Sequence, residues 1–353
     1  MIILLKLIFI LVTEYIFIKL LIKNAKVLHL VDIPTERSVH TKMTPRGAGI
    51  GFGFAFFLTI LIFDNSLFME HWPIFLAIFI VFAVGILDDH KDVTPKTKFY
   101  AIFIATFILY ADGVSIDSLG VFWGMELSLG YFALPFTMFA LAGFTNALNL
   151  IDGLDGLAGS IALVILSAFL YIGCQYNDAL MMSLCMITMV AIIAFLLFNW
   201  YPAKIFMGDS GSLFLGFVIS VIATMSLKYI HPVAVLYLAA LPIMDTLIVM
   251  VRRMRRGMSP FTPDKTHMHH ILLNFFSKNV KKTVYFLVLM QILFSSAGLF
   301  LADDSKILPR GLALGSFGTF VGINMIFYMI FTGMKRKQKL IEKLAYRRNK
   351  DRY

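Results

Sequence analysis

The sequence predicts an all-α polytopic integral membrane protein with about eleven transmembrane helices. Hydrophobic residues make up 59% of the 353-residue chain. Apolar runs of about twenty residues, each long enough to cross ~30 Å of hydrocarbon, recur from one end to the other. The predicted spans lie near residues 1–22, 47–64, 72–88, 98–113, 131–149, 157–174, 179–199, 211–228, 232–251, 283–301 and 311–333.

The segments outside these spans are short. The first apolar run has no basic n-region and no small-residue cleavage site, so we expect a retained helix rather than a signal peptide. The alternating stretch "VFWGMELSLGY" predicts a short β-hairpin on the outer side. We expect one transmembrane domain over residues 1–333 and a basic tail over 334–353. The two cysteines, Cys174 and Cys185, do not indicate a disulfide framework or a metal cluster.

Lysine and arginine are distributed unequally between the two sides of the predicted membrane. Of the 31 basic residues, 26 lie on one side; Lys228, Lys306 and Arg310 lie on the other, and Lys6 and Lys19 lie within the first span. The positive-inside rule makes the basic side cytoplasmic, with the N-terminus outside and the C-terminus inside. The formal charge of +10 then indicates contact with anionic lipid rather than with nucleic acid. The predicted cytoplasmic loops are about 23–46, 88–98, 149–157, 199–211 and 252–282.

Polar residues of five separate segments gather in one layer at the cytoplasmic ends of the spans. A proton- or ion-coupled transporter generally places such groups near the bilayer midplane, so this layer favours an enzyme at the membrane surface. A lipid-head-group binding protein without catalysis is the other alternative. The layer comprises Asp88, Asp89, Asp92, Asn146, Asn149, Asp152, Asp155, Asp209, His267, His269 and His270.

The motif "LDDHKD" ends the third span with two adjacent acids. Asp88 and Asp89 would lie at a helix C-terminus, where the macrodipole disfavours negative charge, and they repel each other. A divalent cation, or one of Lys91, Lys96 and Lys98, is therefore expected to pair with them.

The stretch "FTNALNLIDGLDGLAG" also points several oxygens in one direction. Asn146 and Asn149 are one helical turn apart and share a face, and the following glycines allow a turn that presents Asp152 and Asp155. Such convergence suits a hard cation bound to phosphate. The alternative is an ordinary interhelix turn in which Asp155 caps the next helix.

The motif "MGDSGSLFLG" has two interpretations. Asp209 or Ser210 would be an ordinary N-cap for the eighth span. The flanking Gly208 and Gly211 would also let the backbone amides of a helix N-terminus approach an anion closely.

The longest cytoplasmic loop combines four arginines with the histidines of "HMHH". No cysteine or "HExxH" spacing supports a zinc site, and a phosphate-rich ligand suits arginine and histidine better. Asp245 is costly inside a bilayer and is expected to pair with the arginines that begin at Arg252. The stretch "RGAGIGFG" follows no strand, which excludes a dinucleotide fold and leaves close helix packing for Gly49 and Gly53.

Five motifs, in this order over residues of about 30 to 275, resemble the polyprenyl-phosphate N-acetylhexosamine-1-phosphate transferases of the glycosyltransferase 4 family, and most of all their bacterial WecA-type branch. The motifs are "LVDIPTERSVHTKMTPRGAG", "GILDDHKD", "NALNLIDGLDGLAG", "FMGDSGSLFLG" and "RRGMSPFTPDKTHMHH". The resemblance implies a membrane-embedded, catalytic domain over residues 1–333. Such an enzyme moves a sugar-1-phosphate from a UDP-sugar to undecaprenyl phosphate and releases UMP.

The resemblance also implies residue roles. Asn149 and Asp209 would bind Mg²⁺, with Mn²⁺ as the alternative ion. Asp88 and Asp89 would be catalytic, beside the lipid phosphate. Lys98 would lie near the diphosphate, the two acids of "DGLDG" in the nucleotide pocket, and the histidines on the sugar-phosphate side. The implied substrate-binding residues are Lys42, Lys98, Asn146, Asp152, Asp155, His267, His269 and His270.

The loop "HMHH" favours N-acetylglucosamine, although related enzymes with other UDP-N-acetyl sugars share these motifs. The expected setting is a bacterial inner membrane, where the product would start a lipid-linked cell-envelope glycan. Substrates and the bilayer are the expected partners, nucleic acid is not, and the sequence leaves a homo-oligomer open. It also leaves open whether transfer takes one displacement or two, with Asp88 as base, orienting group or nucleophile.

Overall fold

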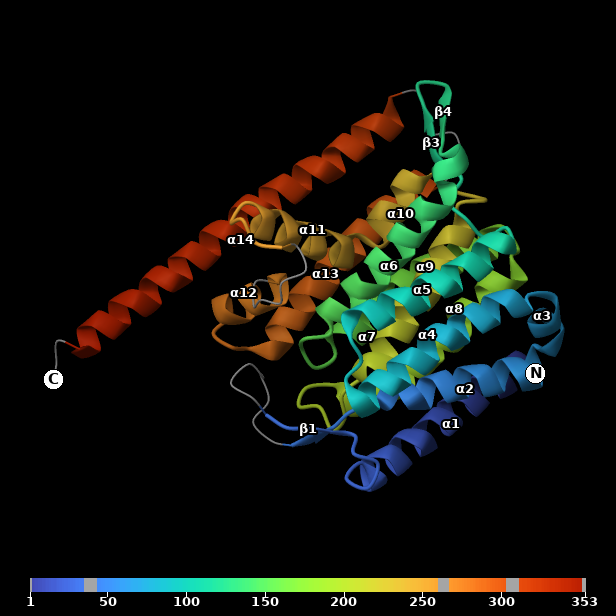
Figure 1. Cartoon of the computed structure of the whole chain (residues 1–353), viewed down its shortest axis with the longest axis horizontal. Coiled ribbons are helices and arrows are strands. Elements are labelled where there is room, and N and C mark those ends of the chain that lie inside the picture. The colour runs from blue at the N-terminus through green and yellow to red at the C-terminus, as the bar shows by residue number, and fades with distance from the viewer. Residues whose placement is uncertain (1, 35–42, 260–266, 303–310, 351–353) are drawn as a thin grey trace.

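The computed structural model describes residues 2–34, 43–259, 267–302 and 311–350, and most of these residues lie in helices packed side by side (Figure 1). The helices are α1 (Ile2–Asn24), α2 (Ala48–Phe63), α3 (Asn65–Glu70), α4 (Trp72–Lys91), α5 (Pro95–Ala111), α6 (Ala133–Ile151), α7 (Leu157–Gln175), α8 (Ala179–Asn199), α9 (Gly208–Ser226), α10 (Pro232–Leu238), α11 (Ala240–Met254), α12 (Met268–Phe275), α13 (Val280–Ala302) and α14 (Leu312–Lys350).

A mostly helical, polytopic membrane architecture is confirmed. Within the described residues, seven helices are long and apolar enough to cross a membrane, namely α4, α6, α7, α8, α9, α13 and α14. The bent pair α10 and α11 would make an eighth span. Helices also occupy the other predicted positions, but α2 and α5 have only 16 and 17 residues and α1 carries four charged side chains. The count of eleven spans remains a prediction.

Helix α9 lies at the centre of the bundle, and small residues let its neighbours approach its backbone. A Cβ atom added to Gly49 of α2 would lie 1.9 Å from the backbone nitrogen of Gly211, and one added to Gly85 of α4 would lie 2.6 Å from Cα of Ser210. Gly53 faces the ring of Phe82 in the same way. The close packing predicted for Gly49 and Gly53 is confirmed, and it fixes the first turn of α9 between α2 and α4.

The span predicted over residues 232–251 is not one continuous helix, because α10 and α11 meet at 87°. The break exposes backbone groups that must be satisfied inside the protein. Gln291 of α13 supplies both partners: its side-chain oxygen accepts from the Leu241 amide at 3.0 Å, and its amide nitrogen donates to the Leu238 carbonyl at 2.8 Å. A residue about fifty positions away therefore stabilises the bend.

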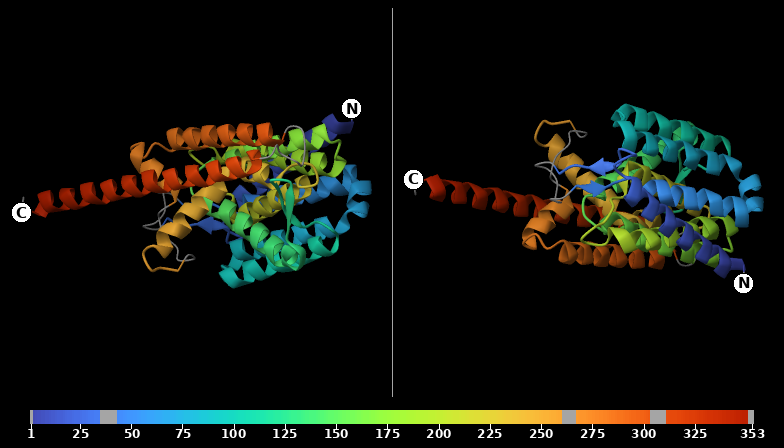
Figure 2. Two further views of the ribbon diagram at one scale, coloured as in Figure 1. Left: turned by 90° about the horizontal axis from the view of Figure 1, so that it is seen from above. Right: turned by 90° about the horizontal axis from the view of Figure 1, so that it is seen from below.

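The last helix is longer than predicted. Helix α14 continues without interruption from Leu312 to Lys350, so most of the expected tail at 334–353 is a helical extension of the final span. The helix reaches well beyond the other helices in all views (Figure 1, Figure 2). It is held near the bundle by the Gln338 side chain, which donates to the Ile271 carbonyl of α12 at 3.1 Å.

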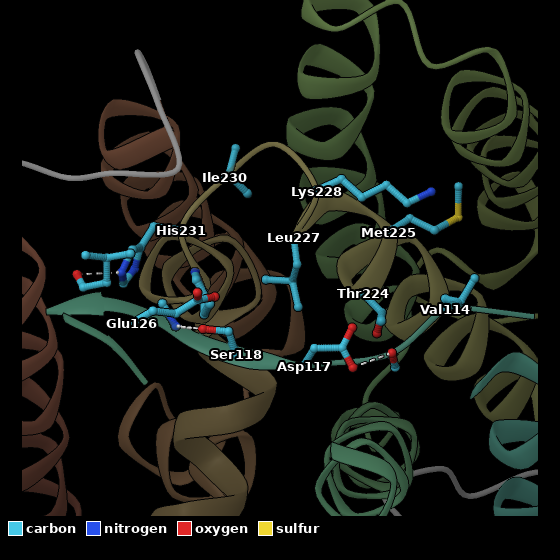
Figure 3. A pocket seen from close by; sticks show the side chains of 15 residues that line it. Val114, Asp117, Ser118, Glu126, Thr224, Met225, Leu227, Lys228, Ile230 and His231 are labelled. Atoms are coloured by element: carbon cyan, nitrogen blue, oxygen red, sulfur yellow. Dashed lines mark hydrogen bonds between the residues drawn. The ribbon is translucent and has the colours of Figure 1, made fainter. Parts of the chain in front are cut away.

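The predicted β-hairpin is confirmed, with β3 (Ser118–Phe122) paired antiparallel to β4 (Met125–Ser128). Buried His231 holds it: its Nδ1 accepts from the Val233 amide at 3.2 Å, which leaves Nε2–H to donate to the Val121 carbonyl at 3.3 Å. A cavity of about 280 Å³ lies between the hairpin and the end of α9 (Figure 3). The hairpin precedes the start of α6, whereas Asn149 lies at the end of α6, so hairpin and polar layer occupy opposite ends of the bundle.

This arrangement predicts which positions face outwards. In a Cys174→Ser background, which removes the exposed native cysteine, Glu126→Cys on β4 should react with an impermeant thiol reagent in intact cells. Lys91→Cys, at the polar end of α4, should react only after the membrane is opened, because the positive-inside rule predicts that the basic side is cytoplasmic. The measurement is labelling before and after permeabilisation. Labelling of Lys91→Cys from outside would contradict the predicted orientation.

Candidate active site

The polar layer predicted from the sequence surrounds a cavity of about 400 Å³. Helices α4, α6 and α9 end or begin there, and strands β1 (Val31–Asp32) and β2 (Thr44–Pro45) close one side as an antiparallel pair. The backbone of Phe206 and Met207 forms hydrogen bonds with residues 45, 48 and 49. These bonds connect the segment before α9 to β2 and to the start of α2. The lining residues are Asp32, Arg46, Asp89, Asn149, Asp152, Gly153, Leu154, Asp155, Asn199, Phe206, Met207, Gly208, Asp209, Ser212 and His270.

Asp89 of α4 caps the N-terminus of α9. Its carboxylate, in a residue only 3% exposed, accepts from the backbone amides of Asp209 at 2.8 Å and Ser210 at 3.1 Å, and from the Ser210 hydroxyl. Gly208 has φ of +75°, and a Cβ atom there would lie 2.6 Å from the carboxylate. The N-cap prediction for Asp209 or Ser210 is therefore wrong, because Asp89 provides the capping oxygens. The negative group at this helix N-terminus is therefore the Asp89 carboxylate and not a bound anion.

Asp88, the neighbouring residue, has a different set of partners. One oxygen accepts from the Val93 amide at 2.7 Å, and the other accepts from Lys98 Nζ at 2.7 Å. Lys98 also forms an ion pair with Asp209. Of the partners predicted for the two adjacent acids, Lys98 is thus confirmed for Asp88.

Asn149 and Asp209, the predicted metal ligands, are in contact. Asn149 donates to the Asp209 carboxylate at 3.2 Å and to the Ser212 hydroxyl at 2.8 Å. Asn146, one turn earlier on α6, is half-buried and does not line the cavity. Its predicted role in substrate binding remains a prediction, and Lys42 lies outside the described residues.

The turn between α6 and α7 presents Asp152 and Asp155 to the cavity. Asp155 accepts from the Ala203 amide at 2.9 Å and does not cap α7, so that alternative is wrong. Asn199 at the end of α8 instead accepts from the Gly156 amide at 2.8 Å. Burial, followed by the negative charges of Asp209, Asp155 and Asp89, raises the pKa of Asp152 to about 7.

The three histidines differ in position. His267 lies 2.8 Å from Asp245, through Nδ1, and the same carboxylate accepts from the Met268 amide at 2.7 Å. The expectation that Asp245 pairs with the arginines is wrong, because its two oxygens face His267 and the Met268 amide. His269 is buried against Gly153, and His270 lines the cavity.

Sequence reasoning did not assign several lining residues to the site. Arg46 donates through Nη2 to the Asp89 carbonyl at 2.8 Å, and Ser212 lies beside Asn149. Asp32 and Asn199 also line the cavity. Asp32 and Arg46 fall within the quoted motif "LVDIPTERSVHTKMTPRGAG", which contained the signal; Asn199 ends an apolar span and gave none.

The charge of the cavity tests whether a divalent cation fits. Five aspartates line it, whereas Arg46 and His270 are the basic residues among the lining side chains. No group of three His, Cys, Asp or Glu side chains in the described segments is arranged as a metal site. Mg²⁺, however, commonly takes one or two carboxylates and completes its coordination with water and substrate phosphates. The Asp209 carboxylate, in strongly negative surroundings, fits such an ion, and Asn149 beside it would supply an oxygen ligand with its amide turned the other way.

Comparison with known proteins gives consistent matches. Residues 71–227 match the model of "Glycosyl transferase family 4". The chain is 33% identical over 283 residues, 77% of each chain, to a "Probable undecaprenyl-phosphate N-acetylglucosaminyl 1-phosphate transferase" of Bacillus subtilis. It is 35% identical over 260 residues, 69% of each chain, to the "Undecaprenyl-phosphate alpha-N-acetylglucosaminyl 1-phosphate transferase" of Yersinia pestis. The Escherichia coli K12 protein of that name is 31% identical over 303 residues, 83% of this chain and 82% of its own.

The raised pKa of Asp152 predicts a pH-dependent stability. A carboxyl whose pKa is higher in the fold than in the unfolded chain stabilises the fold fully below pH of about 4, and this contribution is lost as the pH rises through about 7. Asp152→Asn, which stays neutral, should therefore stabilise the metal-free protein at pH 8, by on the order of 1–2 kcal/mol given the partial exposure of the site.

The measurement is thermal unfolding in detergent with a chelator, at pH values from 4 to 8. The difference between variant and wild type should grow towards pH 8. A difference that does not change with pH would show that Asp152 carries no excess repulsion.

Proposed function

This chain belongs to glycosyl transferase family 4, and we propose that it transfers N-acetylglucosamine-1-phosphate from UDP-N-acetylglucosamine to undecaprenyl phosphate, with release of UMP. The names of the three relatives support the lipid acceptor and the transferred group. The loop that contains His267, His269 and His270 supports the choice of sugar, because it resembles the loop of enzymes that take this donor.

The observation that carries the proposal is the place of the acidic cavity. It lies where α4, α6 and α9 end or begin, and each of these helices is long and apolar enough to cross a membrane. A lipid phosphate cannot leave the bilayer, and a nucleotide sugar cannot enter it. The two substrates must therefore meet at the membrane surface, which is the position that this cavity would have.

The reaction is an in-line displacement at phosphorus. An oxygen of the lipid phosphate forms a bond to the β-phosphorus of the UDP-sugar, the bond from that phosphorus to UMP breaks, and UMP leaves with the electron pair. A phosphate monoester has a second pKa of ~6 and is already largely ionised at pH 7, so the attack does not require a strong base. Asp88 is placed beside the lipid phosphate in this scheme, and Lys98 is the cation assigned to the diphosphate.

Asn149 and Asp209 would hold Mg²⁺, or Mn²⁺ as the alternative, and the acids around them favour a cation. When bound, the ion would neutralise the diphosphate and stabilise the departing UMP. Arg46, which donates to the Asp89 carbonyl and lines the cavity, adds a positive charge to the lining. Asp152 and Asp155 are assigned to the nucleotide.

The proposed setting is the cytoplasmic membrane of a bacterium, with the cavity on the cytoplasmic side, the N-terminus outside and the C-terminus inside. The unequal distribution of basic residues supports this orientation. The product would then form on the side where nucleotide sugars are made.

The proposal is tested with purified protein, undecaprenyl phosphate and a panel of UDP-sugars. UMP and a lipid diphosphate that carries N-acetylglucosamine are the expected products. A protein that releases no UMP with any UDP-N-acetylhexosamine would refute the proposal, and release with another of these sugars alone would refute the choice of donor.

A variant at Asp209 tests the metal assignment. Asp209→Asn retains the backbone amide that binds Asp89, so the protein should still fold, but turnover should fall at least ~10- to 100-fold because a carboxylate ligand is lost. The measurement is the rate of UMP release over a series of Mg²⁺ concentrations. The matched control is Asp117→Asn at the exposed hairpin end, which should keep the wild-type rate. A near-normal rate for Asp209→Asn at limiting Mg²⁺ would contradict the assignment.

A further inference from the structure

Asp245 is a buried carboxylate that the transfer scheme above does not use. It lies on α11, just after the bend, and is 1% exposed. One oxygen faces His267 Nδ1 at 2.8 Å, and the other accepts from the Met268 amide at 2.7 Å. His267 is the N-cap residue of α12, but its side chain makes no capping bond. Asp245 therefore caps α12 from another helix and fixes its first turn.

From His267 a series of contacts leads to the cavity. The rings of His267 and His269 are stacked, with centroids 5.8 Å apart and planes inclined by 15°. His269 in turn packs against the turn that carries Asp152, because a Cβ atom added to Gly153 would lie 2.3 Å from Nε2 of His269. The ring of His270, which lines the cavity, lies 4.2 Å from that of His269. The position of Asp245 thus influences where His270 lies in the cavity lining.

His269 is a buried histidine whose ring nitrogens form no hydrogen bond with the described residues. It is 2% exposed. The residue does not line the cavity, so His269 serves as a packing contact between α12 and the Gly153 turn. Burial, followed by the charge of His270, lowers the pKa of His269 to about 3, so the ring is neutral near pH 7.

We propose that Asp245 is a positioning residue of this active site: through His267 and the first turn of α12 it holds His269 against Gly153, and it thereby places His270 at the cavity, on the side assigned to the sugar-phosphate part of the donor. The inference rests on the proposed function. Asp245 touches neither substrate in this scheme. Its carboxylate keeps the proton of His267 on Nδ1 and orients the ring, as an outer carboxylate does for histidines in other sites.

A pair of variants at His267 separates positioning from a direct contact. Asparagine places its amide nitrogen near the position of Nδ1, so His267→Asn keeps a donor for Asp245. Glutamine places its amide nitrogen near Nε2, so His267→Gln loses that donor. His267→Asn should retain more kcat/KM for the UDP-sugar than His267→Gln, which should lose on the order of 100-fold, as for a misplaced reacting group. The opposite order would overturn the proposal.

Variants of Asp245 test the same link from the other side. In Asp245→Asn the side-chain NH2 group would face one of the two donors, His267 Nδ1 or the Met268 amide. This variant should lower kcat/KM by a similar factor, while UMP affinity and the unfolding temperature stay near their wild-type values. Asp245→Asn combined with His267→Gln should lose little more than either alone, because both break one interaction. The control is Thr246→Val, which removes a buried hydroxyl that has no partner among the described residues and should change nothing.

The outcomes distinguish a failure of the proposed function from a failure of the positioning role of Asp245. Additive losses in the double variant, or a loss of UMP affinity equal to the loss of kcat/KM, would show that Asp245 is only a structural clamp. If Asp245→Asn does not fold, the comparison of His267→Asn with His267→Gln decides alone. A wild type that transfers no sugar-phosphate refutes the proposed function, whereas a working wild type with fully active His267→Gln and Asp245→Asn refutes only this inference.

Discussion

The contact between the Asp89 carboxylate and the first turn of α9 is the interaction on which the rest of the site depends. It joins the end of α4 to the start of α9 through two backbone amides and a hydroxyl, at a point where the helix dipole favours negative charge. Successive residues of a helix point about 100° apart, so fixing Asp89 turns Asp88 to another side. There Asp88 meets Lys98, and Lys98 also reaches Asp209. One cap therefore holds Asp89 in the cavity lining and leaves Asp88 to Lys98, outside that lining.

Backbone contact makes this arrangement rigid. Gly49 and Gly85 let α2 and α4 approach the first turn of α9 more closely than any side chain would allow, and Gly208 leaves room for the carboxylate. The opposite wall of the cavity is built differently. Helix α12 is attached through the polar contacts of Asp245, and its His269 is packed against Gly153. The site thus combines a wall fixed by close helix packing with a wall fixed by one buried carboxylate.

The sequence predicted the polar layer because acids, amides and histidines stand out at the ends of apolar runs. It also placed Lys98 near Asp88, since the two are only ten residues apart. Which distant groups pair was not accessible in this way. The cap of α9 comes from 120 residues earlier in the chain, and Asp245 binds a histidine rather than the nearer arginines. The bend between α10 and α11 depends on Gln291 of α13. These features arise from tertiary contacts, which local patterns do not encode.

The central claim is that Asp89 organises the start of α9, and amide hydrogen exchange tests it most directly. The donors are the backbone amides of Asp209 and Ser210, so their protection reports the cap itself. In Asp89→Ala these two amides should exchange much faster than in the wild type, while the middle of α9 stays protected. Asp88→Asn, which leaves both capping bonds in place, should keep the wild-type pattern. Unchanged protection of Asp209 and Ser210 in Asp89→Ala would contradict the account.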